Sequence, residues 1–198
     1  MADRGRVLLW AGLAGAAAVL GLGARFGYDH LESGAAEVAD LGGAFELVDH
    51  DGAPITEAAF EGQPSALFFG FTHCPEICPT TVYDIETWMQ DLGPEADGFR
   101  AWFVTVDPER DTPEVLKEYL EYQTDRVTGI TGPPEDVRAM ADAWRVYHNR
   151  VPLEDGDYTM DHTSLVYLLD EDGQYAELIR YGEDRESAVA KIRALLDG

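Results

Sequence analysis

The sequence predicts an α/β fold in which a central mixed sheet is flanked by helices. The apolar runs at 65–71 and 101–107 are typical of buried strands, and each is followed by residues with helical periodicity. Toward the C-terminus, two further strand-like runs join at an Asp-Gly turn and precede a last helix. A chain of 198 residues with 45% hydrophobic residues can bury a core, so we expect one globular domain with an appendage.

The first 25 residues are predicted to be a membrane anchor. Arg4 and Arg6 precede an uncharged run of 18 residues from Val7 to Ala24, which reaches the lower length limit for a transmembrane helix. Because positive charge stays on the cytoplasmic side, we expect one span in a bacterial cytoplasmic membrane and a domain that faces the periplasm. A cleaved signal peptide is the alternative, although this run exceeds the ~7–15 apolar residues usual there.

Residues 26–43 are predicted to be a linker and residues 44–198 the globular domain, because small and acidic residues without apolar periodicity fill the first of these segments. The domain opens with a strand at 45–49 that enters an Asp-Gly turn, which predicts an N-terminal hairpin. After the buried strand and a loop with both cysteines, a helix is expected over 80–93, since its apolar residues share one face.

The second half of the domain continues the alternation. Thr112 as N-cap and Pro113 at the first helical position mark the start of the next helix. The expected elements are strands at 101–107, 126–131, 164–170 and 175–181, and helices at 112–123, 134–147 and 184–197. A βαβ half followed by a ββα half, with an extra strand and helix between them, is the order of a thioredoxin-like fold.

The chain is strongly acidic, with a formal net charge of −24 at pH 7. A field of this sign repels nucleic acid phosphates and anionic lipid surfaces, so we expect no nucleic acid partner. Two interpretations stay open. The charge is either an adaptation for solubility, for example in a salty environment, or a means of attracting a cationic partner or metal ion.

Both cysteines of the chain lie in the stretch "GFTHCPEICPTT" at residues 70–81. Cys74 and Cys78 follow the carboxyl end of a central strand, which is where α/β folds bind ligands. In a helix, residues four apart have Cβ atoms roughly 5–6 Å apart, whereas a disulfide prefers about 3.5–4.5 Å. Two thiolates can bind one metal ion without such distortion, and a helix N-terminus favours the thiolate.

A third metal ligand is sought among five histidines. His162 lies in "MDHTSLVYLL", in an expected loop before the strand at 164–170. If that strand runs antiparallel to the one that leads to Cys74, the loop faces the cysteines; the alternative is a hydrogen-bonded loop histidine beside Asp161. The other four are expected elsewhere: His30 and His50 in solvent, His73 on the other side of the backbone, and His148 at a helix end.

Three motifs in this order resemble the Sco family of copper-binding assembly factors for cytochrome c oxidase, the Sco1/SenC proteins: "GFTHCPEICPTT", "FVTVDPERDTPEVLKEY" and "DHTSLVYLLD". The similarity spans about residues 38–197. It implies a thioredoxin-like fold, one N-terminal anchor, and delivery of copper to, or maturation of, the binuclear copper centre of oxidase subunit II. By position, Cys74, Cys78 and His162 match the copper ligands of the family, although its motif usually has aspartate where this chain has Glu76.

The donor set supports a copper chaperone independently, because thiolates and imidazole suit Cu(I), whereas structural zinc usually needs a fourth protein ligand. The alternative is a periplasmic thiol-disulfide oxidoreductase that reduces cysteines of the oxidase subunit or of another exported protein. Such enzymes usually have two residues between their cysteines, and this chain has three. Peroxide reduction is a third hypothesis, from the stretch "VTVDPERDTP". Other periplasmic copper chaperones or thioredoxin-like reductases are expected as further partners.

The stretch "VDPERDTP" is expected to have a structural role. Asp107, Arg110 and Asp111 can build a turn and cap the next helix, with Arg110 paired to an acidic neighbour. A contact surface for the oxidase subunit is the alternative.

Overall fold

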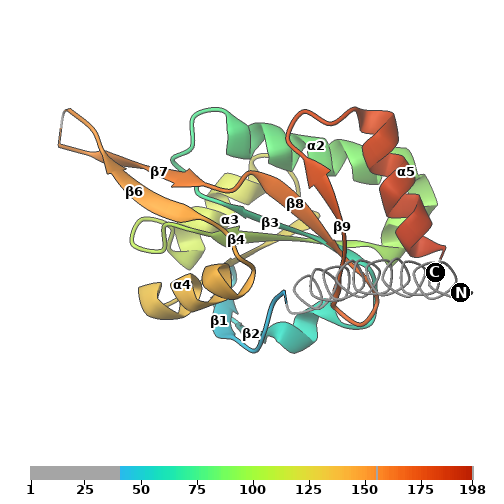
Figure 1. Ribbon diagram of the computed structural model, residues 1–198, viewed down its shortest axis with the longest axis horizontal. Helices are drawn as coiled ribbons and strands as arrows, with labels where there is room; N and C mark the ends of the chain where they lie inside the picture. The colour runs from blue at the N-terminus through green and yellow to red at the C-terminus, as the bar shows by residue number, and fades with distance from the viewer. Residues whose placement is uncertain (1–40, 155, 198) are drawn as a thin grey trace, which may run out of the picture. The chain divides into compact units, whose positions relative to one another are not determined.

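The computed structural model describes residues 41–154 and 156–197. The predicted anchor and most of the predicted linker lie outside these residues, and no helix within them has the length and apolar character needed to cross a membrane. The described residues form nine strands, four α-helices and two 3-10 helices (Figure 1). In chain order they are β1 (Glu46–Asp49), β2 (Pro54–Thr56), η1 (Glu57–Phe60), β3 (Ser65–Gly70), α2 (Ile77–Leu92), η2 (Gly93–Gly98), β4 (Arg100–Thr105), α3 (Pro113–Glu121), β5 (Val127–Thr131), α4 (Pro134–Ala143), β6 (His148–Pro152), β7 (Tyr158–His162), β8 (Leu165–Leu169), β9 (Tyr175–Arg180) and α5 (Arg185–Leu196).

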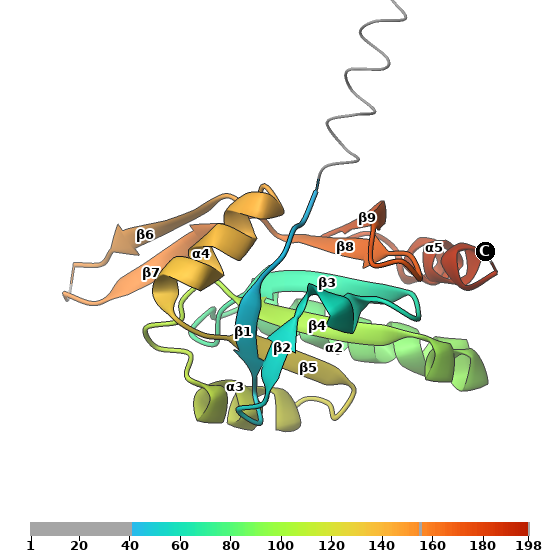
Figure 2. The ribbon, with the colours of Figure 1, turned by 90° about the horizontal axis from the view of Figure 1, so that it is seen from below.

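Seven of the described strands form one mixed sheet in the order β2-β1-β5-β4-β3-β8-β9. Strands β3, β4 and β5 are parallel to one another, and β8 is antiparallel to β3. Helices α2 and α3 lie on one face of this sheet and α4 on the other (Figure 2), while α5 packs against α2. The predicted mixed sheet with flanking helices and the N-terminal β1–β2 hairpin are therefore confirmed.

Strand β3 is buried along its whole length, as its continuous apolar sequence predicts. Its side chains alternate between two aromatic clusters because successive strand residues point to opposite faces. Phe68 packs against Phe103 on the side of α2 and α3, with ring centroids 5.7 Å apart, and Phe69 packs against Tyr167 on the other side at 6.1 Å. These clusters fix the end of β3, from which the cysteine loop leaves.

The structure corrects the predicted helix at 134–147. Helix α4 ends at Ala143, and Arg145 has a φ angle of +53°, which no α-helix can continue. The chain then forms a second, two-stranded sheet of β6 and β7, which extends from one side of the domain (Figure 1) and which no pattern in the sequence predicts. His148 therefore lies in a strand, not at a helix end.

Candidate metal centre

The cysteine loop leaves the carboxyl end of β3 at Gly70. A Cβ atom at this glycine would lie 2.9 Å from the rings of both Phe68 and Phe103, so a larger residue would displace the start of the loop. Cys74 closes the loop with a backbone hydrogen bond to the carbonyl oxygen of Phe71 at 3.3 Å. Helix α2 begins at Ile77, three residues before the predicted start, and places Cys78 in its first turn.

The two free cysteines are in direct contact. The backbone N–H of Cys78 donates to the Sγ atom of Cys74 at 3.3 Å, so the first turn of α2 points an N–H group at this sulfur. The side chain of Cys78 is completely buried, whereas Cys74 is partly exposed. Solvent and a partner can therefore reach the pair from the side of Cys74.

His162 comes from the last position of β7, not from a loop as expected. Its Nε2 atom lies 3.5 Å from the Sγ atom of Cys78, and its ring packs edge-on against Phe71 with centroids 5.7 Å apart. Its Nδ1 atom lies 2.9 Å from the carbonyl oxygen of Thr163, which can only accept, so Nδ1 carries a proton. In the neutral ring this leaves the Nε2 lone pair directed at the cysteines, as metal-binding histidines require.

The separation of these atoms suits a shared metal ion. Metal–sulfur and metal–nitrogen bonds of about 2.3 and 2.0 Å, at tetrahedral or trigonal angles, place the two donor atoms roughly 3.5–3.7 Å apart. The observed distance between Cys78 Sγ and His162 Nε2 is 3.5 Å. Within the part of the chain that the structure describes, no three His, Cys, Asp or Glu side chains form a complete metal-binding group as they stand. Because Cys74 Sγ is engaged by hydrogen bonds, metal binding has to replace those bonds.

The two sulfurs differ in proton affinity. The pKa of Cys74 is lowered to about 3, mainly because the Cys78 thiol donates a hydrogen bond to its sulfur; burial opposes this, and the backbone N–H groups of Cys78 and Glu76 reinforce it. The pKa of Cys78 is raised because its proton is held in that hydrogen bond and because it is buried beside the Cys74 thiolate. At neutral pH the pair thus shares one proton, which a metal ion must displace.

Selective alkylation tests this difference. We expect iodoacetamide to modify Cys74 and to spare Cys78 in the reduced protein, because only Cys74 is both ionised and partly exposed. The rate should be nearly constant between about pH 5 and pH 8, whereas an unperturbed thiol with a pKa of about 8.5 would react roughly tenfold faster per unit of pH. Mass spectrometry of peptides identifies the labelled site. The Cys74→Ser variant should stay unlabelled under the same conditions, and faster labelling of Cys78 would contradict the assignment.

A buried carboxylate outside the predicted ligand set supports the cysteine loop. Asp111 is completely buried and accepts hydrogen bonds from the backbone N–H of Thr72 at 3.0 Å and from its hydroxyl at 2.6 Å. The hydroxyl of Thr105, at the end of β4, donates to the same carboxylate at 2.6 Å. Burial raises the pKa of Asp111, and these hydrogen bonds oppose the rise. Residue 111 therefore links the cysteine loop to β4.

The other described histidines do not join the sulfurs. His73 has a half-exposed side chain whose Nδ1 lies 3.1 Å from the Thr72 hydroxyl. His148 lies opposite His162 in the β6–β7 ladder, and its Nε2 is 3.2 Å from Asp142. These contacts give each residue a local partner away from the two thiols.

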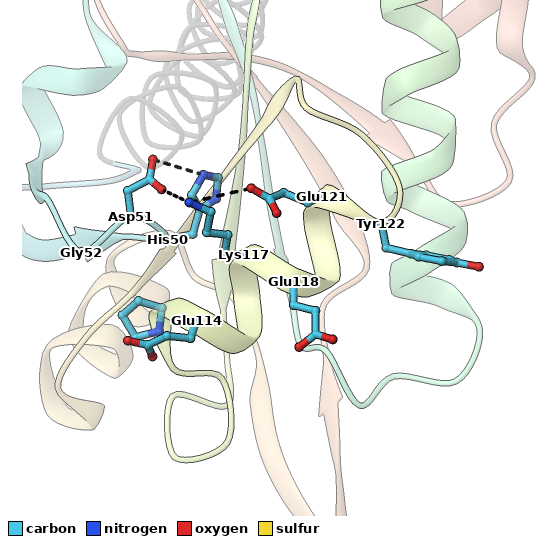
Figure 3. Close-up of a pocket in the computed structure, with 9 residues that line it drawn as sticks. His50, Asp51, Gly52, Glu114, Lys117, Glu118, Glu121 and Tyr122 are labelled. Carbon is cyan, nitrogen blue, oxygen red and sulfur yellow. Dashed lines mark hydrogen bonds and ion pairs between the residues drawn. The ribbon is translucent and has the colours of Figure 1, made fainter.

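His50 lines a separate hollow between the β1–β2 turn and helix α3 (Figure 3). It is not solvated as expected, because its side chain is 18% exposed and its Nδ1 accepts the N–H of Gly129 at 2.9 Å. A neutral histidine that binds metal through Nε2 carries its proton on Nδ1, so this hydrogen bond opposes metal binding. The acidic residues of the hollow are partly neutralised by Lys117, whose Nζ lies 2.7 Å from Asp51.

The sheet topology and the dithiol at the start of α2 define a thioredoxin-like protein with a histidine beside its cysteine pair. The family model described as SCO1/SenC matches residues 33–197. The chain belongs to the SCO1/SenC family.

Individual relatives agree with this assignment. The chain is 37% identical over 156 residues to "Protein SCO2, mitochondrial" of Saccharomyces cerevisiae, covering 77% of this chain and 52% of the yeast protein. It is 38% identical over 137 residues to the SCO2-like protein of Rickettsia felis, covering 68% and 67% of the two chains. The matched region thus spans about half the length of the yeast relative.

Solved structures share the fold. The structure of Bradyrhizobium japonicum ScoI with copper bound is 40% identical, with a TM-score of 0.73 over 78% of this chain and 99% of the other. A more distant structure, 22% identical with a TM-score of 0.64 over 81% and 95% of the chains, is of BsSco, described as a member of the Sco family of cytochrome c oxidase assembly proteins. At 22% identity, this second similarity supports the shared fold alone.

Proposed function

We propose that this protein is a copper chaperone that delivers copper to, or helps insert it into, the binuclear copper centre of cytochrome c oxidase subunit II. One observation carries the proposal: His162 presents its Nε2 atom 3.5 Å from Cys78 Sγ, beside a second cysteine. Membership in the SCO1/SenC family and the copper-bound relative support it. We further propose that residues 1–25 anchor the domain on the periplasmic side of a bacterial cytoplasmic membrane.

Copper is the cargo that the donor set favours. Two thiolates and one imidazole are soft and borderline ligands that suit Cu(I), and a further oxygen or nitrogen ligand suits Cu(II). Cys74 is already ionised, Cys78 releases its proton on binding, and His162 binds as the neutral ring. The partly exposed side of Cys74 provides the entry path.

Copper stoichiometry tests the proposal. The reduced full chain is expected to bind about one copper ion tightly, with sulfur-to-Cu(II) charge-transfer absorption in the oxidised complex. Metal analysis after removal of loosely bound copper gives the ratio. A fully reduced wild-type protein that binds no copper would refute the chaperone function.

The His162→Ala variant tests the third ligand. We expect it to impair Cu(II) binding strongly while two thiolates retain Cu(I) weakly, because the harder ion relies more on nitrogen and oxygen donors. Competition with chelators of known affinity measures both ions. His148→Ala is the matched control, since it removes the histidine opposite His162 in the same hairpin without removing a group in contact with the sulfurs. Equal binding of Cu(II) by wild type and His162→Ala would exclude His162 as a ligand.

A thiol-disulfide reductase is the second candidate function, and the lowered pKa of Cys74 favours it. A thiolate beside a protonated second cysteine is the arrangement with which a dithiol attacks a partner's disulfide. Such a reductase would reduce a disulfide between the cysteines of the oxidase subunit, and a thioredoxin-like partner would then reduce the disulfide formed between Cys74 and Cys78. Its turnover with a model disulfide should disappear in Cys74→Ser and persist in His162→Ala, which separates it from copper binding.

A further inference from the structure

Within the described residues, the histidine hairpin, which consists of β6 and β7, forms no strand pairing with the seven-stranded sheet. The C-terminal end of β7 is joined to the main sheet through β8, which begins three residues after His162, whereas the rest of the hairpin is held by its side-chain contacts. Tyr158 lies at the first position of β7, four residues before His162, so both side chains point to the same side of the strand. Its contacts outside the hairpin are made with residues 107–111, which we call the DPERD segment.

Tyr158 is held at three points. Its ring lies between two guanidinium groups, with Arg110 Cζ 3.7 Å and Arg150 Cζ 3.9 Å from the ring centroid. Its hydroxyl donates to Asp107 at 2.8 Å, and its backbone carbonyl accepts from Arg110 Nη1 at 3.0 Å. Asp107, which is 2% exposed, also accepts from Arg110 Nε. These charged hydrogen bonds lie largely out of water, where they are stronger than on an open surface.

The same segment holds the cysteine loop at its other end through Asp111 and Thr72, as described above. Between the two ends the backbone is tightly turned, because the N–H groups of Arg110 and Asp111 both donate to the carbonyl oxygen of Asp107, at 3.1 and 2.9 Å. One short turn thus contacts both the element that carries the cysteines and the element that carries the histidine.

We propose that Arg110 and Tyr158 are positioning residues that hold His162 over the two cysteines. This inference rests on the proposed copper-binding function. The DPERD segment is the rigid spacer of the site: Asp111 fixes the cysteine loop, and Arg110 with Asp107 fixes the histidine hairpin at Tyr158. Removing the spacer contact changes the distance between imidazole and thiols without removing any copper ligand.

The residues of the DPERD segment favour a role in positioning the site over a role in stabilising the fold. It places two buried carboxylates four residues apart, and the Nη2 atom of Arg110 is buried without a hydrogen-bond partner among the described residues. Buried charges of this kind cost free energy unless they are fully paired, and apolar residues of similar size are often more stable. Buried charges that reduce the stability of the fold are expected mainly at functional sites.

Copper affinity of the full chain tests the proposal. Arg110→Ala is expected to weaken Cu(II) binding by about 10–100-fold, the range typical for loss of a residue that supports a metal ligand. Cu(I) binding should change by less than about threefold, because both thiolates remain. Tyr158→Phe keeps the ring between the two arginines and removes only the hydrogen bond to Asp107, so it should change Cu(II) affinity in the same direction by a smaller factor.

A second readout needs no copper. The His162 ring makes T-shaped contacts with Phe71 and Phe68, so the ring currents of these residues should displace its NMR resonances from those of an exposed histidine. In Arg110→Ala these resonances should move toward exposed values. Arg185→Ala is the control, because it removes an ion pair with Asp91 between α5 and α2 and should change neither the resonances nor the affinity.

Two results would overturn the proposal. The first is a folded Arg110→Ala variant with unchanged Cu(II) affinity and unchanged His162 resonances. The second is an equal loss of Cu(I) and Cu(II) affinity with resonance changes throughout the domain, which would show general destabilisation. If the wild-type chain binds no copper, the proposed function fails, and the His162 resonances alone decide whether Arg110 and Tyr158 position the ring.

Discussion

Serine at either position 74 or position 78 is expected to abolish tight binding of both Cu(I) and Cu(II). A hydroxyl is a hard, protonated group that replaces a soft thiolate poorly, and the remaining cysteine and His162 offer only two donors. We expect the copper ratio to fall from about one per chain to a level removed by a weak chelator, with loss of the sulfur-to-copper absorption.

The two serine variants also differ from each other. Cys78→Ser leaves Cys74 at the partly exposed edge, where it stays open to alkylation, whereas Cys74→Ser leaves only the buried, protonated sulfur of Cys78. Circular dichroism should show an unchanged fold in both, since serine is close to cysteine in size. Retention of one tightly bound copper by either variant would remove that cysteine from the ligand set.

Phe68→Ala is expected to lower the free energy of unfolding by about 3–5 kcal/mol, the range for loss of a fully buried phenylalanine. The side chain is completely buried at the centre of β3, with its ring 5.7 Å from Phe103 and 6.3 Å from the ring of His162. The cavity therefore opens beneath the candidate metal centre as well as in the core. A stability of about 5–15 kcal/mol is typical of a domain, so this one change removes a large part of it.

Urea denaturation followed by tryptophan fluorescence measures this effect. Tyr122→Ala is the control, because this aromatic side chain is 92% exposed and its removal should change stability by less than about 0.5 kcal/mol. A loss below about 1 kcal/mol in Phe68→Ala would mean that the neighbouring rings collapse into the space and that β3 is not the centre of the core.

The main sheet could be predicted because its strands carry strong signals. The apolar run at β3 and the one at β4 are long enough to indicate burial on both faces, and Asp172-Gly173 marks the β8–β9 hairpin. The contact between Cys78 and His162 followed from one topological step, the antiparallel pairing of β3 and β8, even though the histidine lies in β7.

The histidine hairpin could not be predicted because its sequence lacks these signals. Strand β6 is mostly exposed, so it shows no apolar alternation, and helix α4 before it ends at Ala143 without a glycine or proline to mark its end. The structural role expected for "VDPERDTP" is confirmed, since Thr112 caps α3 and Arg110 pairs with Asp107. Its contacts with Thr72 and Tyr158 span 39 and 48 or more positions in sequence, and local patterns carry no information about such distances.

The separate sheet that carries His162 has a consequence for the exchange of metal between proteins. Under the proposed function, the thiols belong to the main domain and the imidazole to the separate β6–β7 sheet, so the three proposed ligands need not release the metal together. An acceptor that supplies one donor atom can substitute for the imidazole while both sulfurs stay bonded, and the remaining bonds then pass across in turn. We expect the ion to stay coordinated throughout such an associative exchange. The rate of metal transfer should then depend on how readily the β6–β7 hairpin moves, whereas the affinity for the metal should depend on the two thiolates.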